Sequence, residues 1–224
     1  MLVTLGVIGV VAAMTLPMLA ENYQRRIIET RLKKFYTTYN QAILRSVEDN
    51  GPYNGWGYYK SESWNSEGKY KLTKEDFDNS FNLYLRNYLN IIQKREVIYT
   101  NGNSSYLYYL ADGSAFTFAT YNNRDLYYYP KSPEHCLKQK AVNRTGVCSF
   151  YFIFAPTLKD WPYHKDKGLE PWKWAWDGNP QSLYDDKSPN GQGCKTNENG
   201  AFCTALIQYN DWQFPKDYPR KIRY

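Results

Sequence analysis

The first twenty residues constrain the fold of this 224-residue chain more than any other stretch. Residues 1–20, MLVTLGVIGVVAAMTLPMLA, carry no charged side chain. Their apolar run is interrupted only by Thr4, Gly6, Gly9, Thr15 and Pro17. A run of roughly 18 or more such residues is long enough to cross the hydrocarbon core of a bilayer as a helix. We therefore expect residues 1–20 to lie in a membrane or to pack against other apolar helices.

The helical pattern continues beyond this run. Apolar side chains recur at the spacing of one helix face, at Ile28, Leu32, Phe35, Tyr39, Ala42 and Ile43. The first stop signal is Asn50-Gly51-Pro52, a typical helix end. Residues 1–50 are thus predicted to form a helical segment of roughly 70 Å, apolar all round in its first half and amphipathic in its second. The remaining residues 51–224 are enough for one globular head with its own core.

Three roles are open for the apolar run. A cleaved signal peptide is disfavoured, because no Lys or Arg precedes the run and no small-residue cleavage site ends it. A plain membrane anchor fits the hydropathy, but the nearby cations all follow the run, within residues 25–34. By the positive-inside rule these charges would keep the head in the cytoplasm, where its cysteines would stay reduced. The third role is a helix that moves between the membrane and a protein assembly.

The chain resembles the type IV pilins and the type II secretion pseudopilins at its N-terminus. The matching residues are Leu2-Val-Thr-Leu-Gly6-Val-Ile-Gly9-Val-Val-Ala-Ala13, then Pro17, then the polar continuation from Glu21. A weaker similarity to the ends of some bacterial pilin-like proteins is carried by Cys203-Thr-Ala-Leu-Ile207 and Trp212-Gln-Phe-Pro-Lys-Asp-Tyr-Pro219. The resemblance implies a single-pass helix that lies first in the inner membrane and later in the core of a filament. The residues assigned to this helix are Leu2, Leu5, Gly6, Gly9 and Pro17.

The resemblance also gives a physical role to the small residues of this helix. Glycines let helix backbones approach closely, and Pro17 is expected to kink or locally melt the helix between Gly9 and itself. The alternative is the ordinary tolerance of such residues in membrane helices. A prepilin also has a basic leader, a processed and methylated junction and a glutamate, which would all precede Leu2. We expect either a start further upstream or a chain that is anchored without assembling.

Four cysteines predict disulfides. Their spacing is not CxxC, which disfavours a zinc site, and an even number in an exported protein favours disulfide bonds. Three pairings are possible, and we favour the two local ones, Cys136–Cys148 and Cys194–Cys203. Each bond would stabilise the head by about 2–3 kcal/mol through loop-closure entropy. The second would match the C-terminal disulfide loop of many pilins.

The head is expected to be α+β. The segment Thr73-Lys-Glu-Asp76 has the pattern of a capping box, and apolar spacing predicts a helix over 74–93. Strands are predicted at 96–100, 105–110, 115–120, 149–155 and 205–209, with hairpin turns at Asn101-Gly102 and Asp112-Gly113. Loops are expected at 51–71, 121–135 and 159–200. The prediction is a long helix packed on an antiparallel sheet, with a second helix and long aromatic loops.

The aromatic loop 159–200 leaves two alternatives open. It contains Trp161, Trp172, Trp174 and Trp176. We favour rings that cover the sheet, and the alternative is a platform that binds a glycan or a peptide. Oxygen ligands for Ca²⁺ are also present at Asp177, Asp185, Asp186 and Asn190, but they lack an ordered ligand pattern. We therefore predict no metal site and no cofactor.

Catalysis and nucleic-acid binding are not expected. The chain has two histidines, His135 and His164, and no nucleophile-elbow, zinc-protease or phosphate-loop motif. Its net charge of +6 is divided between residues 24–34 and the last residues Arg220, Lys221 and Arg223. A nucleic-acid binder usually has a denser basic patch on a recognisable module.

The sequence therefore predicts a structural subunit of a type IV pilus or of a type II secretion pseudopilus, with its head outside the cytoplasm on a cell-surface or periplasmic filament. The expected partners are other copies, other pilins, the assembly machinery and, before assembly, inner-membrane lipid. One alternative is a membrane-anchored binding protein that recognises a glycan or a peptide through its Trp- and Tyr-rich loops. A DNA-uptake pilin is the other.

Overall fold

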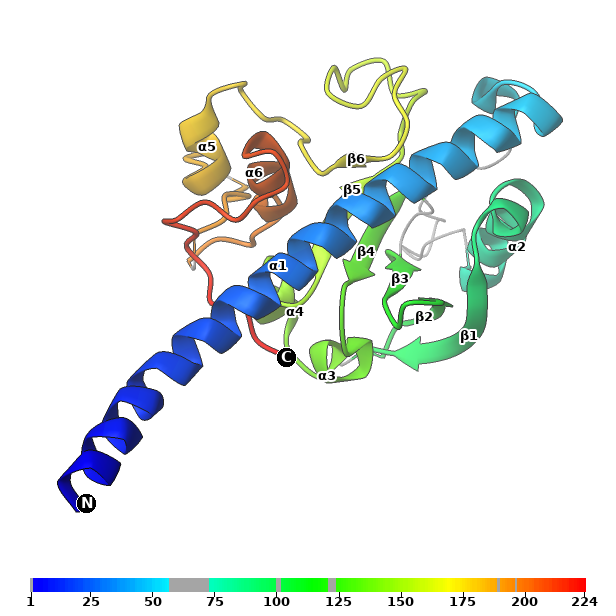
Figure 1. Cartoon of the computed structure of the whole chain (residues 1–224). Helices are drawn as coiled ribbons and strands as arrows, with labels where there is room; N and C mark the ends of the chain where they lie inside the picture. Colours follow the sequence, from blue (N-terminus) through cyan, green and yellow to red (C-terminus); the bar gives the residue numbers. More distant parts are fainter. Residues whose placement is uncertain (1, 57–72, 100–101, 121–123, 189, 196) are drawn as a thin grey trace.

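The computed structural model describes residues 2–56, 73–99, 102–120, 124–188, 190–195 and 197–224, without the side chains of residues 2–18, 141 and 142. Its helices are α1 (Leu2–Asn50), α2 (Lys74–Tyr84), α3 (Pro133–Leu137), α4 (Ala141–Arg144), α5 (Pro180–Tyr184) and α6 (Cys203–Tyr209). Its strands are β1 (Ile91–Ile98), β2 (Ser104–Leu110), β3 (Ala115–Phe118), β4 (Asp125–Tyr129), β5 (Phe150–Ile153) and β6 (Glu170–Pro171). Figure 1 shows α1 lying across the sheet, with α2 near one edge and α5 and α6 near the other.

The sheet is an open antiparallel meander. Its six strands are hydrogen-bonded in sequence order, and every neighbouring pair is antiparallel. The turn between β2 and β3 confirms the predicted Asp112-Gly113 hairpin, since the Ser114 carbonyl accepts from the Leu110 N–H at 2.8 Å. Gly113 has a φ of 79°, which a glycine adopts without steric cost. The other predicted turn, Asn101-Gly102, lies partly outside the described residues.

One stripe of α1 packs on the sheet. All six residues of the predicted apolar face are buried, and Ile28, Leu32 and Tyr39 have no exposed surface. The helix ends at Asn50, and Gly51 follows with a φ of 74°, as the stop signal predicts. The predicted α+β class, with a long N-terminal helix on an antiparallel sheet and a second helix, is confirmed.

The alternation of side chains along the strands gives the sheet two cores. On the α1 side, Tyr108 of β2 pairs with Phe116 of β3, which pairs in turn with Tyr128 of β4. On the other side, Ala115 and Tyr129 pack with the Cys136–Cys148 disulfide. The sheet is thus covered by α1 on one face and by α3 with its disulfide on the other.

The predicted helix over 74–93 is correct only in its first half. The capping box is present, because the Asp76 N–H donates to Thr73 Oγ1 at 3.2 Å and the Thr73 N–H donates to Asp76 Oδ2 at 2.8 Å. The helix α2 ends at Tyr84, however, and β1 begins at Ile91. Leu85 and Leu89 still reach the core, at 0% and 5% exposure. The helical spacing of Leu85 and Leu89 therefore arises because the connection between α2 and β1 is buried, and not because α2 continues.

Other boundaries also differ from the predictions. Residues 205–209 were predicted as a strand and belong instead to α6. The predicted loop 121–135 contains β4 and the start of α3, and the predicted loop 159–200 contains β6 and α5. The strand predicted at 96–100 begins five residues earlier, at Ile91. The strands β3 and β5 are shorter than predicted, while β2 starts within one residue of its prediction.

Candidate functional site

The predicted membrane or filament helix lies within the backbone of α1, but its assigned residues are outside the side chains that the structure describes: Leu2, Leu5, Gly6, Gly9 and Pro17. Within the described part of the chain, no helix is sufficiently long and apolar to cross a membrane. The first described large apolar side chains of α1 are Leu19 and Tyr23, which are 63% and 65% exposed. The head therefore does not cover this end of the described helix.

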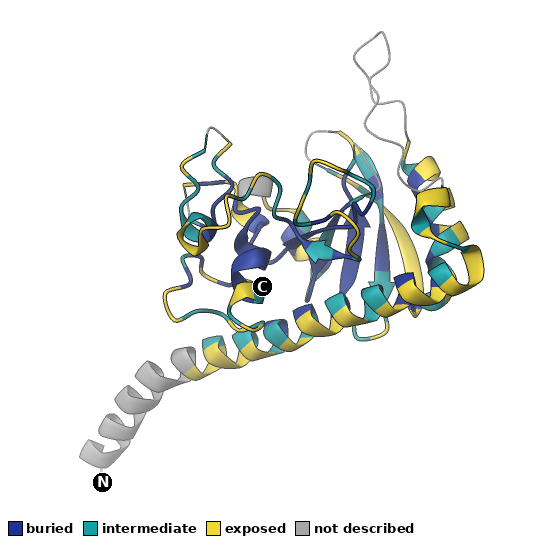
Figure 2. Cartoon of the chain, turned by 90° about the horizontal axis from the view of Figure 1, so that it is seen from above, coloured by how far each residue is buried: buried dark blue, intermediate teal, exposed yellow. Residues whose placement is uncertain are grey.

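Head contacts hold α1 from residue 24 onward. Lys131 donates from Nζ to Gln24 Oε1 at 3.1 Å, and the Phe214 N–H donates to Glu29 Oε1 at 2.7 Å. Further along, the guanidinium of Arg31 donates to the carbonyls of Pro130 and Asp112. Figure 2 shows the consequence, with the buried residues of α1 on its sheet side and exposed residues on the outer side.

An aromatic cluster fixes the middle of α1 to the sheet. The Phe35 ring stacks on Tyr128 with centroids 4.1 Å apart and an interplanar angle of 10°. It also contacts Phe116 at 5.6 Å and Phe152 at 5.4 Å. Such pairs contribute roughly 0.5–1.5 kcal/mol each beyond the burial of their area. This part of α1 is therefore integral to the head.

A pair of hydrogen bonds fixes the register of α1 against β6. The Asn40 side chain accepts from the Leu169 N–H at 2.8 Å and donates to the Leu169 carbonyl at 3.0 Å. Gly168 permits this approach, since a Cβ there would lie 1.8 Å from Asn40 Oδ1. Beside the pair, Tyr36 donates to Glu170 Oε1 at 3.0 Å. Burial, followed by the Glu170 carboxylate, raises the pKa of Tyr36 to about 12.

Both predicted local disulfides are present. Cys136 and Cys148 have Cα atoms 5.7 Å apart, and Cys194 and Cys203 have Cα atoms 4.7 Å apart. Both distances lie within the usual range for such bonds. The first bond joins α3 to the start of β5, and the second closes the loop that precedes α6. The four cysteines are thus used in structural bonds, and none is free.

A buried arginine organises the C-terminal segment. Arg220 is 4% exposed and donates to carbonyl oxygens of two separate segments, the end of α4 and the Cys194–Cys203 loop. The acceptors are Cys194 at 2.7 Å, Thr145 at 3.2 Å, Lys195 at 2.6 Å and Glu198 at 2.6 Å. Gly200 passes close by, because a Cβ there would lie 2.8 Å from Arg220 Cζ. No motif in the sequence marks this residue as a structural centre.

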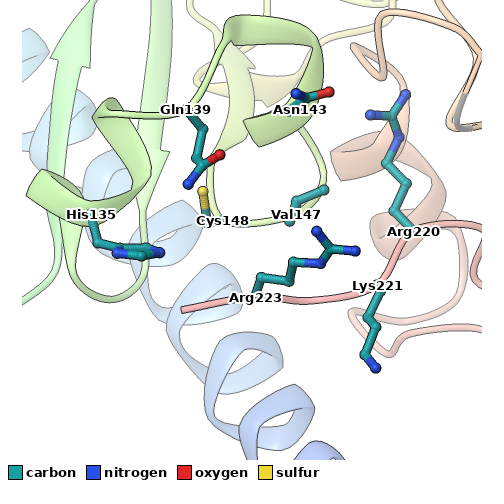
Figure 3. Close-up of a pocket in the computed structure, with 8 residues that line it drawn as sticks. All are labelled: His135, Gln139, Asn143, Val147, Cys148, Arg220, Lys221 and Arg223. Carbon is teal, nitrogen blue, oxygen red and sulfur yellow. The ribbon is translucent and has the colours of Figure 1, made fainter.

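A basic cavity of about 310 Å³ opens beside this arginine. It lies between the α3–α4 segment and the C-terminal residues, and it is lined by His135, Gln139, Asn143, Val147, Cys148, Arg220, Lys221 and Arg223. In Figure 3 the Gln139 amide and the Arg223 guanidinium extend into the space between these two segments, whereas Lys221 extends away along the rim. Among the described residues no carboxylate lines the cavity.

Three of the four tryptophans in the aromatic loop form one cluster. Trp172 is 8% exposed and stacks on Tyr151 of β5 with centroids 4.6 Å apart. Trp161 contacts both Trp172 and Trp174 at 5.9 Å. The preferred interpretation, rings that cover the sheet, is therefore confirmed for Trp172. Trp176 packs separately on Tyr163, at 4.8 Å.

The three carboxylates considered as Ca²⁺ ligands, Asp177, Asp185 and Asp186, are paired with protein donors. Asp186 accepts from the N–H groups of Ser188 and Gln192, both at 3.0 Å, and Asp185 pairs with Lys195. Asp177 accepts from the Asn179 N–H at 2.9 Å and from Ser182 Oγ at 2.8 Å. Within the described ranges no group of three or more His, Cys, Asp and Glu side chains is placed to hold a metal ion.

The two histidines have different environments. His164 is 1% exposed, and its Nε2 accepts from the Lys173 N–H at 3.2 Å. Burial, followed by the charges of Lys173 and Lys167, lowers the pKa of His164 to about 3, so the ring is neutral near pH 7. His135, by contrast, is exposed on α3 and lines the basic cavity.

Residues 18–222 match a family of unknown function, DUF6613, and the chain belongs to this family. The match contains the head and the amphipathic part of α1, and it begins near the end of the apolar run. A comparison with curated proteins and a comparison with solved structures each found no match.

Proposed function

We propose that this family member is a pilin-like subunit, held in the membrane and assembled into a filament by residues 1–20. The observation that carries the proposal is the change in what covers α1 along its length. From Ile28 onward the head buries one face of the helix, whereas Leu19 and Tyr23 are exposed. The uncharged run continues from there to the N-terminus. The head leaves α1 uncovered at Leu19 and Tyr23, where the uncharged run ends, and an apolar run of this length needs lipid or other helices as a partner.

Energetics favour such a partner strongly. Burial of one Leu-sized side chain is worth roughly 1.5–3 kcal/mol, and nearly every side chain between residues 2 and 20 is apolar. Lipid tails are as apolar as leucine, so exchange of lipid for protein depends on close helix packing. Gly6 and Gly9 supply small surfaces for this packing, and Pro17 supplies a position where the helix can bend.

The two disulfides support a head outside the cytoplasm. Disulfides persist in oxidising compartments and are rare where glutathione and thioredoxin keep thiols reduced. Both bonds here are buried, because Cys136, Cys148, Cys194 and Cys203 are at most 2% exposed. An exported head on an inner-membrane helix accounts for both the disulfides and the apolar run, although the cations of residues 25–34 would favour the opposite orientation.

Two substitutions in the apolar run test assembly. Gly9→Leu and Pro17→Leu should reduce the amount of protein in filaments sheared from cells, while the near-ultraviolet circular dichroism of the head is unchanged. Lys159→Ala, an exposed change in the head, is the matched control and should assemble normally. Normal assembly of both leucine variants would contradict the proposal.

A second function has one observation in its favour. Trp174 and Trp176 are only partly buried, and half-exposed tryptophans are common at binding surfaces. In this alternative the protein is a membrane-anchored receptor for a glycan or a peptide, and it forms no filament. Trp176→Ala would then abolish ligand capture by whole cells, and Gly9→Leu would leave ligand capture unchanged. The filament proposal predicts instead that Gly9→Leu reduces filament assembly and that Trp176→Ala leaves assembly unchanged.

A further inference from the structure

We infer that the basic cavity between α3, α4 and the C-terminal segment is a binding site for a phosphate group, and that its ligand is the headgroup of an anionic phospholipid. The inference rests on the proposed function in one respect, the placement of residues 1–20 in a membrane. The chemistry of the cavity stands independently of that placement.

The lining of the cavity has the chemistry of an anion site. Arg223 provides an exposed guanidinium, whose planar fork matches the oxygens of a phosphate. Gln139 and Asn143 add exposed amides that can donate hydrogen bonds, and His135 adds an imidazole. Figure 3 shows Arg223 and Gln139 extending toward the same space. The nearest carboxylate on α3, Glu134, is directed instead to Tyr109 and Arg95.

The positive charge of the site is held in place by the fold. The Arg220 guanidinium donates to the carbonyl oxygens of Thr145, Cys194, Lys195 and Glu198, which holds it at the inner end of the cavity. The same bonds fix the segment that carries Lys221 and Arg223. On the opposite wall the Cys136–Cys148 disulfide fixes the start of β5 to α3. A rigid site requires less ordering when a ligand binds.

The position of the cavity favours a lipid over a free anion. Tyr224 follows Arg223 directly, and its ring lies 5.9 Å from Lys131 Nζ, which in turn donates to Gln24 of α1. Gln24 is only four residues beyond Ala20, the last residue of the uncharged run, which is about 6 Å along the helix axis. The cavity thus lies at the end of the head that would face a bilayer. In Figure 1 the C-terminus and α3 lie at this end.

The test titrates the full chain in micelles of an uncharged detergent. The two probes are inorganic phosphate and dihexanoyl phosphatidylglycerol below its micelle concentration, and calorimetry measures binding. Loss of one hydrogen-bonding contact to a bound phosphate changes the affinity roughly fivefold. We expect Arg223→Gln to weaken binding about fivefold, and the Gln139→Ala/Arg223→Gln pair, which removes both side chains that extend into the cavity, to weaken it about 25-fold. Arg26→Gln, an exposed change on α1 near the same end, is the matched control and should change affinity less than twofold.

The outcomes separate the two sources of phosphate. Binding of the lipid that is lost in the pair variant and kept in Arg26→Gln supports the inference. Binding of inorganic phosphate without binding of the lipid would replace the lipid with a soluble phosphate compound. Binding of neither probe, or equal weakening by Arg26→Gln, would overturn the site. Flotation of the wild-type protein with neutral phosphatidylcholine vesicles tests the membrane helix separately, so a failed cavity and a failed anchor give different results.

Discussion

Replacement of Arg220 should destabilise the head more than any exposed substitution. Its guanidinium connects the Cys194–Cys203 loop, the end of α4 and the C-terminal segment through four carbonyl acceptors. Hydrogen bonds from a charged group are worth about 1.5–3 kcal/mol each, and a buried acceptor left without a partner costs about 1–3 kcal/mol. The cost of burying the charge offsets part of this gain. For Arg220→Met, which keeps the apolar stem, we expect a loss of about 3–5 kcal/mol.

Two further variants isolate the role of the guanidinium fork. Arg220→Lys keeps the charge but offers one ammonium in place of a planar set of donors, so its loss should be about half that of Arg220→Met. Arg26→Met removes an exposed arginine and should change the free energy of unfolding by less than about 0.5 kcal/mol. Urea unfolding of the oxidised protein in mild detergent, followed by near-ultraviolet circular dichroism, measures all three. A stability of Arg220→Met within about 0.5 kcal/mol of wild type would refute the reasoning.

Three further predictions concern single residues. The pKa of His164 is about 3 in the folded chain against an ordinary value of 6.5, so the unfolded chain binds a proton first as the pH falls. The free energy of unfolding should therefore drop below pH 6.5 by up to about 1.4 kcal/mol per pH unit. His164→Gln should reduce this slope, whereas the exposed His135→Gln should leave it unchanged. Equal slopes in the two variants would contradict the account. Gly168→Ala should displace Asn40 and cost about 2–3 kcal/mol in urea unfolding, and a neutral effect would show that the close approach is unnecessary. Phe35→Ala should cost about 3–5 kcal/mol, whereas a loss below about 1 kcal/mol would mean that α1 is separable from the head.

The features predicted best are those that local chemistry decides. The stripe from Ile28 to Ile43 has the period of one helix face, and the head buries this face. The capping box at Thr73 and the turn at Gly113 depend on side chains and dihedral angles within a few residues. The two disulfides join cysteines that are close in sequence, so the favoured pairing needed little knowledge of the fold.

The errors arise where tertiary contacts override local preference. Cys203–Tyr209 contains the β-branched Thr204 and Ile207, which favour a strand by propensity, yet the segment is the helix α6. Residues 203–207 are all buried, so no polar face marks the helical period. In β4 the tyrosines pack on both faces of the sheet, and the alternation that identifies a strand is absent.

The basic cavity was also not predicted, because tertiary contacts bring its residues together. The cations among the last residues are evident from the sequence, but Gln139 and Asn143 belong to no motif. They meet Arg223 only because the Cys136–Cys148 disulfide and the Arg220 hydrogen bonds place two distant segments side by side. The spacing of these residues along the chain does not indicate that they are close in space.

Cross-linking between copies in the cells that make the protein tests the proposed assembly most directly. A photoreactive amino acid placed at Leu5 should yield a ladder of covalent dimers and larger multimers, because residues 1–20 would pack against other copies in the filament. The same amino acid at Leu44, which is 69% exposed on the outer face of α1, is the matched control and should yield far less. Products at Leu5 that consist only of lipid adducts would contradict assembly through this helix.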